Sequence, residues 1–130
     1  MIETRLRAAL LDWLAADPLL AAEINAVVEE APSRTAAPWL GIVASASTDW
    51  STKDRRGREV RLAVELHLRG DDPATGAGLV SAVERRIEAL PPVQDGFHVA
   101  STVFLRARAE QRAANTRAVL LEYRFRLLEA

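Results

Sequence analysis

Residues 60–69, with the sequence VRLAVELHLR, decide how the rest of the chain is interpreted. Apolar side chains occupy every second position from Val60 onward, while Arg61, Glu65 and His67 occupy positions between them. Successive side chains of a β-strand point to opposite faces of a sheet. The alternation therefore predicts a strand with one buried face and one polar face.

A second strand is expected directly before this one. Residues 39–44 are apolar, and the chain becomes polar from Ser45 onward. The connecting residues 51–59 contain no apolar side chain and are too many for a two-residue turn. The sequence therefore predicts a hairpin over residues 38–69 whose cationic loop is offered to something outside the fold.

Two amphipathic helices are predicted on either side of the hairpin. Residues 2–16 and 74–90 both repeat apolar side chains at spacings of three and four, and two prolines end the second segment. Asp17 and Asp72 each precede a proline, as an N-cap precedes the first helical position. A short helix is therefore also expected over residues 18–24.

The remaining segments complete a sheet. Residues 97–109 and 116–128 alternate in hydrophobicity and are joined by a polar turn, while residues 26–29 are compatible with a short strand before a loop at 31–37. We predict a two-layer α+β fold, with an antiparallel sheet of at least four strands and two long helices packed on one face.

The sheet face opposite the helices is predicted to be charged. Opposite charges on neighbouring strands stabilise such a face by roughly 0.2–1 kcal/mol per pair. Phe104 also falls on this face by parity, which indicates either a partner surface or an irregularity in the strand. The charged side chains expected there are Glu65, His67, Arg69, Arg106, Arg108, Glu122, Arg124 and Arg126.

Length and composition exclude several classes of protein. With 130 residues the chain has the size of one domain, and its net charge of −1 is unlike that of a general nucleic-acid binder. The absence of cysteine excludes disulfides and thiolate metal sites. No segment approaches the roughly 18 apolar residues of a membrane span, so we expect synthesis in the cytosol and no membrane partner.

No catalytic, cofactor or metal site is predicted. His67 and His98 lack a second ligand at metal-binding spacing, and we interpret Glu65 and His67 as part of a solvated polar face. The sequence contains no Gly-x-Ser-x-Gly elbow, and the glycines at 76 and 78 lie within a helical pattern. The protein is therefore not expected to be an enzyme.

A family resemblance adds to these interpretations. The segments 37–40, 45–53 and 66–70, together with Gly57, resemble the tail-completion, or tail terminator, proteins of long-tailed phages, which also occur in prophages and gene transfer agents. The most characteristic part is Asp-Trp-Ser-Thr-Lys at 49–53, and the likeness covers nearly the whole chain. The chain departs at His67, where an aromatic residue often precedes the strand end.

The resemblance implies a structural virion protein with a single tail-terminator-like domain over residues 1–130. Such proteins form a hexameric ring that caps the tail tube, stops its elongation and provides the surface to which the head docks. The implied partners are further copies of the chain, the tail tube protein and a head–tail connector or stopper protein. DNA in the lumen stays an open alternative as a partner. The implied location is the cytoplasm during assembly, then the head-proximal end of the virion tail.

Candidate interface residues come from the hairpin loop and the charged sheet face. The loop cations are expected to contact a neighbouring subunit, the tube or DNA rather than to support the fold. A small-molecule-binding regulatory α+β domain and a small hydrolase are the alternatives, but the sequence offers neither convergent polar groups nor a recognisable nucleophile. The candidates are Trp50, Lys53, Arg55, Arg56, Arg58, Arg69, Arg106, Arg124 and Arg126.

Overall fold

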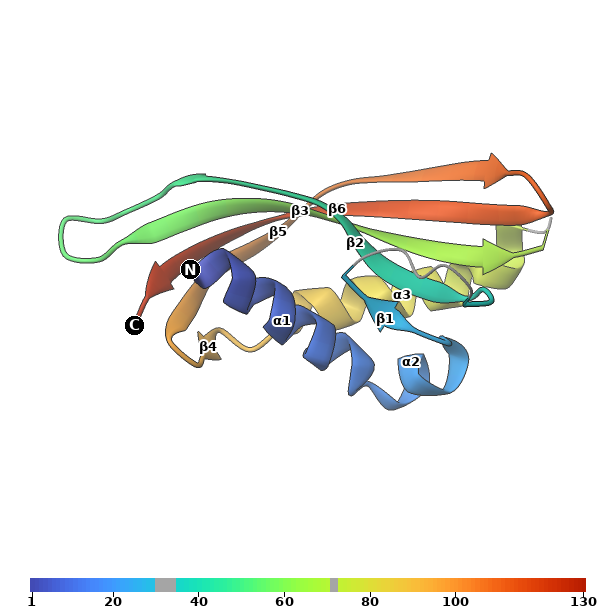
Figure 1. Cartoon of the computed structure of the whole chain (residues 1–130), viewed down its shortest axis with the longest axis horizontal. Helices are drawn as coiled ribbons and strands as arrows, with labels where there is room; N and C mark the ends of the chain where they lie inside the picture. The colour runs from blue at the N-terminus through green and yellow to red at the C-terminus, as the bar shows by residue number, and fades with distance from the viewer. Residues whose placement is uncertain (30–34, 71–72) are drawn as a thin grey trace.

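The computed structural model describes residues 1–29, 35–70 and 73–130. Its elements follow the order expected from the sequence, with one added short strand (Figure 1). The elements are α1 (Ile2–Ala15), α2 (Pro18–Glu23), β1 (Val27–Val28), β2 (Trp39–Asp49), β3 (Gly57–Arg69), α3 (Pro73–Glu88), β4 (Val93–Gln94), β5 (Phe97–Arg112) and β6 (Thr116–Glu129).

All six strands belong to one sheet with the order β1-β2-β3-β6-β5-β4. The long strands β2, β3, β6 and β5 pair antiparallel with their neighbours, whereas β1 pairs parallel to β2 through Val27 and Leu40. Strands β3 and β6 form an uninterrupted ladder from Gly57–Leu128 to Arg69–Thr116. This ladder holds the centre of the sheet.

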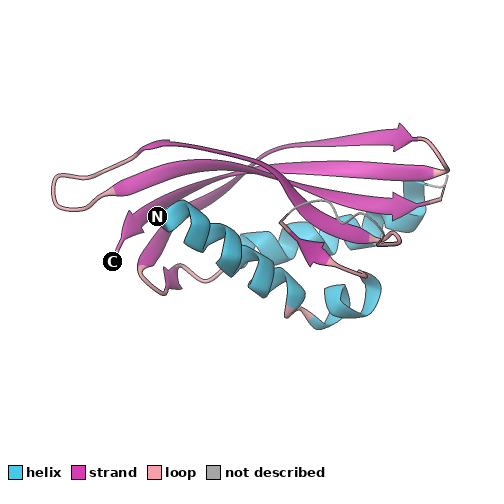
Figure 2. Cartoon of the chain, in the orientation of Figure 1, coloured by secondary structure: helices cyan, strands magenta, loops and turns pink. Residues whose placement is uncertain are grey.

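The predicted fold class is wrong. The sheet is mixed rather than antiparallel, and it curls as a half-barrel around α1 instead of forming one of two layers (Figures 1 and 2). Strands of 11–16 residues dominate the chain, and long strands accumulate the right-handed twist that curls a sheet. The helices therefore fill the hollow of a strand-rich fold and do not constitute a second layer of equal weight.

The core lies between the hollow of the sheet and the helices. The buried face of β3 contributes Leu62, Val64 and Leu66, and α1 presents its stripe of buried leucines toward it. Trp13 fixes α1 against α3, because its indole Nε1 donates to the carbonyl of Arg86 at 2.7 Å while the Arg86 guanidinium covers the ring at 3.3 Å. The single apolar faces predicted for the central strands thus form the core.

Two irregularities in β5 change which side chains face the core. The register of β5 against β6 shifts between Val99 and Ser101 and again between Phe104 and Arg106. Between these shifts the alternation is inverted, so Phe104 lies beside the buried ring of Tyr123, with their centroids 5.6 Å apart. Phe104 is therefore on the helix side of the sheet, and of the two interpretations of its parity the strand irregularity is confirmed.

The charged face contains a connected network that is less solvated than expected. Glu65 is only 8% exposed, and the Arg112 guanidinium donates to both of its carboxylate oxygens at 3.1 and 3.2 Å. His67 Nε2 lies 2.7 Å from Glu65 Oε1, and its ring stacks on Trp39 at 3.8 Å. Burial lowers the pKa of His67 against the opposing effect of Glu65. The interpretation of this pair as a solvated face is therefore wrong.

The predicted loop residues at 31–34 and the predicted N-cap Asp72 lie outside the described residues. By contrast, Asp17 caps α2 as predicted, because its carboxylate accepts from the backbone N–H of Leu20 at 3.0 Å. Among the helices in the described parts of the chain, none has the length and hydropathy needed to cross a membrane.

Candidate interface on the long hairpin

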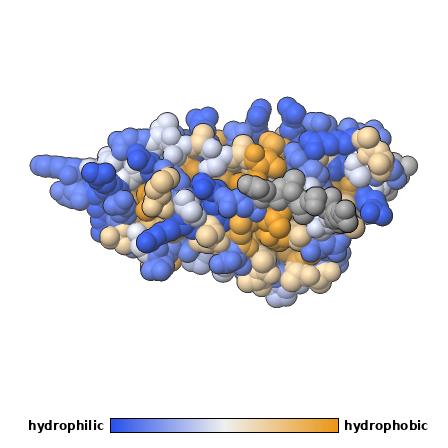
Figure 3. Space-filling view, in the orientation of Figure 1, coloured by the Kyte–Doolittle hydropathy of each residue, from blue (hydrophilic) through white to orange (hydrophobic). Residues whose placement is uncertain are grey.

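The β2–β3 hairpin extends beyond the body of the protein. Its end is the projection at the left of Figure 1, and Figure 3 shows this projection as hydrophilic. The tip is closed by local hydrogen bonds: the Thr52 amide donates to the Arg55 carbonyl at 2.8 Å, and the Arg55 amide donates to Thr52 Oγ1 at 3.1 Å. The exposed side chains of Lys53 and Arg55 are thus displayed on an ordered turn.

A second set of hydrogen bonds fixes the base of the hairpin. Ser51 Oγ donates to Asp49 Oδ1 at 2.7 Å and accepts from the Gly57 amide at 3.0 Å. The Trp50 amide donates to the Gly57 carbonyl at 3.0 Å. The Ser51 hydrogen bond, supported by the nearby Arg58, holds the pKa of the Asp49 carboxyl below its usual value. This base keeps the loop in one orientation relative to the sheet.

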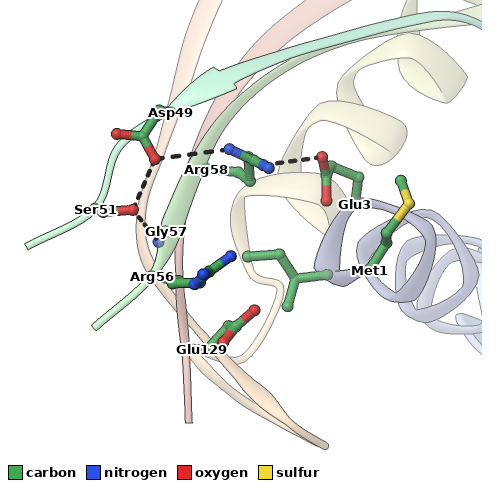
Figure 4. Close-up of a pocket in the computed structure, with 9 residues that line it drawn as sticks. Met1, Glu3, Asp49, Ser51, Arg56, Gly57, Arg58 and Glu129 are labelled. Carbon is green, nitrogen blue, oxygen red and sulfur yellow. Dashed lines mark hydrogen bonds and ion pairs between the residues drawn. The ribbon is translucent and has the colours of Figure 1, made fainter. Parts of the chain in front are cut away.

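A pocket of about 300 Å³ lies where the hairpin base meets the start of α1 (Figure 4). Glu3 is buried in its wall, accepts from Ser47 Oγ at 2.9 Å and pairs with Arg58 Nε at 3.2 Å. Burial raises the pKa of Glu3, but hydrogen bonds from its own backbone N–H and from Ser47, together with Arg58, lower it overall. The carboxylate therefore connects the hairpin to the helix as an anion.

Glu3, Ser47 and Glu129 were not recognised as part of this site from the sequence. A signal for Glu3 exists, because it shares the helical stripe of the buried residues Leu6 and Leu10. A carboxylate within a buried stripe needs a charged or hydrogen-bonding partner, and the partner here comes from β3. Glu129 joins the base through its amide, which donates to the Arg56 carbonyl at 2.9 Å.

The structure brings together only part of the predicted interface set. Lys53, Arg55 and Arg56 are exposed on the loop, whereas Arg58 is engaged with Glu3 and Asp49, so the expectation that all four cations are independent of the fold fails at Arg58. The other members are on different surfaces. Trp50, next to the hairpin loop, lies near Arg126 of β6. Arg124 and Arg126 both approach Glu59 of β3, and Arg106 pairs with Glu122. Arg69 lies at the far end of β3.

A larger and more apolar groove of about 570 Å³ lies at that far end. Leu19 of α2, Leu68 of β3 and Leu79 of α3 contribute to its wall. Among the described residues that line it, Glu23 and Arg69 are the charged ones. Two charges on an apolar wall do not form the convergent polar set that the small-molecule alternative requires.

We expect Glu3→Gln to weaken the attachment of the hairpin. The amide cannot form the charge-assisted pair with Arg58, so the free energy of unfolding should fall by about 1–2 kcal/mol at pH 7. Because folding lowers the pKa of Glu3, its contribution is present above the ordinary value of 4.5 and is lost as the pH falls through the lowered value.

Urea unfolding of both proteins across a pH series from neutral to acid measures this effect. The difference between wild type and Glu3→Gln should be largest at neutral pH and should shrink in acid. A difference that stays constant down to strongly acid pH would contradict the role assigned to the carboxylate.

Comparison with known proteins places this geometry in a class. A chain in the solved structure described as "Virion of native gene transfer agent (GTA) particle" superposes with a TM-score of 0.82 and 25% sequence identity. The alignment covers 96% of this chain and 95% of that chain. A search of curated protein sequences finds no match. The fold is thus that of a structural component of a virion-like particle.

The family follows from the sequence itself. The model of the family "Tail completion protein gp17" matches residues 8–128. The chain belongs to this family, as the resemblance noted from residues 37–70 predicted. It is therefore a structural protein of a phage-type tail.

Proposed function

We propose that the protein is a tail terminator. Copies of the chain, six in the proposed ring, cap the finished tail tube, stop its elongation and provide the surface to which the filled head docks. The ring contacts the tail tube protein on one side and a connector or stopper protein on the other. It thus occupies the head-proximal end of the tail.

The observation that carries the proposal is the projecting hairpin in a chain of this family. A ring requires heterologous contacts, in which two different surfaces of each subunit meet. An ordered tip with exposed cations provides one such surface, and it is displayed clear of the core. The proposed contacts of Lys53, Arg55 and Arg56 are with a neighbouring subunit, with the tube or with DNA in the lumen.

The double variant Arg55→Glu/Arg56→Glu tests this role. Both side chains are exposed, so we expect the melting temperature to change by no more than about 2 °C. Assembly should nevertheless fail, because reversed charges oppose the acidic surface that the cations would meet. Electron microscopy of particles from cells that produce the variant should show overlong or headless tails.

A matched control separates this effect from a change in net charge. Arg5→Glu/Arg85→Glu alters the charge by the same amount at two exposed positions outside the loop, on α1 and α3. The control should assemble normally. Normal particles from the loop variant would remove the loop from the proposed function and direct attention to the charged sheet face.

A further inference from the structure

Two of the long strands have edges that no other strand of the described residues covers along most of their length. Strand β2 pairs with β1 only at Leu40 and Gly41, and β5 pairs with β4 only at Phe97 and His98. Within the described residues, the outer backbone groups of β2 beyond the bulge at Val43, and those of β5 beyond Val99, have no partner strand. Unpaired edges of this kind are templates for the addition of another strand.

Both edges contain a regular segment of similar length. Residues 44–49 of β2 follow the bulge with unbroken register against β3, and residues 106–112 of β5 follow the second irregularity with unbroken register against β6. The first segment contains only small or polar side chains and has no charge before Asp49. It therefore lacks the charges and prolines with which edge strands are commonly protected.

We propose that the β2 edge at residues 44–49 pairs antiparallel with the β5 edge at residues 106–112 of the next copy of the chain. The two edges are the opposite sides of one sheet, so each copy offers one and accepts the other. This is a heterologous contact that closes into a ring when the rotation between copies permits. The proposal deepens the proposed function and rests on it, because it names the contact that joins the ring.

The positions of the two segments fit a closed barrel. The row of paired residues that starts at Ala46, in the β2 segment, crosses the sheet through Arg61 of β3 and reaches Arg124 of β6. The centre of the β5 segment, Ala109, pairs instead with Val119 of β6. The β5 segment is thus displaced along the sheet by five residues of β6, or about 17 Å.

In the proposed ring, the distance from β2 of one copy to β2 of the next copy covers four strand spacings, or about 19 Å. A shift of about 17 Å over this width corresponds to strands tilted by about 40° from the ring axis. Closed β-barrels have strand tilts of about 35–45°. Antiparallel order also continues across the seam, since β2 and β5 run in opposite directions in the sheet.

The side chains at the two edges are compatible with close approach. On the helix side, Ala107 and Ala109 of β5 would lie beside Ser45 and Ser47 of β2. On the helix-free face, the exposed Arg108, which pairs with Glu110 on its own strand, would extend over the small residues of β2. Neither face places two bulky side chains opposite one another.

Cysteine cross-linking in assembled particles tests the pairing, because the chain contains no cysteine. Ala46→Cys is combined with Arg108→Cys in one variant and with Glu110→Cys in another, since both pairs lie on the helix-free face in adjacent registers. Directly opposed cysteines on paired strands can form a disulfide. Mild oxidation should convert most of the protein in at least one variant to a ladder of covalent multimers that a reductant dissolves.

Ser45→Cys/Arg108→Cys is the matched control, because its two cysteines lie on opposite faces of the proposed seam. It should remain monomeric on a denaturing gel. If neither test pair links, or if the control links equally well, the edge pairing is wrong. Normal particles from the unlinked variants would then leave the terminator role intact. Conversely, if cells that lack the protein still produced particles with tails of normal length and attached heads, the terminator role would be wrong.

Discussion

Replacement of Leu66 by aspartate is expected to unfold the protein. Leu66 is fully buried at the centre of the sheet, between Leu40 of β2 and Val119 of β6. The substitution removes an apolar side chain and places an unpaired charge in the core, at a cost of about 5 kcal/mol or more. That cost is comparable with the total stability of about 5–15 kcal/mol that is typical of small proteins.

Circular dichroism and a thermal melt measure the outcome. The Leu66→Asp variant should lose its cooperative transition, as should Leu121→Asp, since Leu121 is equally buried on β6. Leu19→Asp is the control, because Leu19 is 49% exposed on α2 and its substitution should change stability by about 0.5 kcal/mol or less. A cooperative melt of Leu66→Asp near the wild-type temperature would show that the assigned core is wrong.

Replacement of Gly57 by valine is expected to break the base of the hairpin. A Cβ atom at this position would lie 2.3 Å from the carbonyl oxygen of Trp50 and 2.6 Å from that of Leu127. Both are backbone atoms of paired segments, so neither can move away without loss of hydrogen bonds. We expect a loss of roughly 2–3 kcal/mol in the free energy of unfolding, together with faster hydrogen exchange at the amides of Trp50 and of position 57.

Gly78 provides the matched control for this substitution. It lies exposed in α3, where an added Cβ would meet nothing within 4 Å. Gly78→Ala should therefore stabilise the protein by about 0.5–1 kcal/mol, since alanine favours the helix. Unchanged stability and unchanged exchange rates in Gly57→Val would contradict the close packing described at the hairpin base.

The central strands could be predicted because their sequence pattern has only one simple solution. Residues 60–69 and 116–128 alternate over most of their length, and the structure pairs them from end to end with the predicted faces buried. Helix α1 and the N-cap Asp17 could also be predicted, because helical spacing and capping depend only on residues that are close in the sequence.

Features that depend on distant contacts could not be predicted. The irregularities beside Ala100 and Leu105 invert the faces of β5; the parity of Phe104 indicated that an irregularity was one possibility, but the sequence did not locate either shift. The parallel direction of β1 follows from where α2 delivers the chain, not from its two valines. The curl of the sheet arises from twist accumulated over long strands, which a count of strands does not reveal.

The candidate site was predicted in part for a related reason. A charged loop without apolar residues has nothing to bury, so the exposure of its cations could be predicted from the sequence. Arg58 and Glu3 are separated by 55 positions in the chain, and their pairing becomes visible only once α1 lies against the hairpin. The separation of structural from exposed cations therefore requires the fold.

Both chain ends lie at the base of the hairpin, with consequences for how the protein is handled (Figure 1). Met1 lines the pocket that contains Glu3, and the amide of Glu129 bonds to the carbonyl of Arg56. An affinity tag fused to either residue 1 or residue 130 would therefore crowd the cationic loop. An internal tag at Ala113–Ala114, in the turn between β5 and β6, would keep the hairpin end clear but would adjoin the proposed seam at residues 106–112.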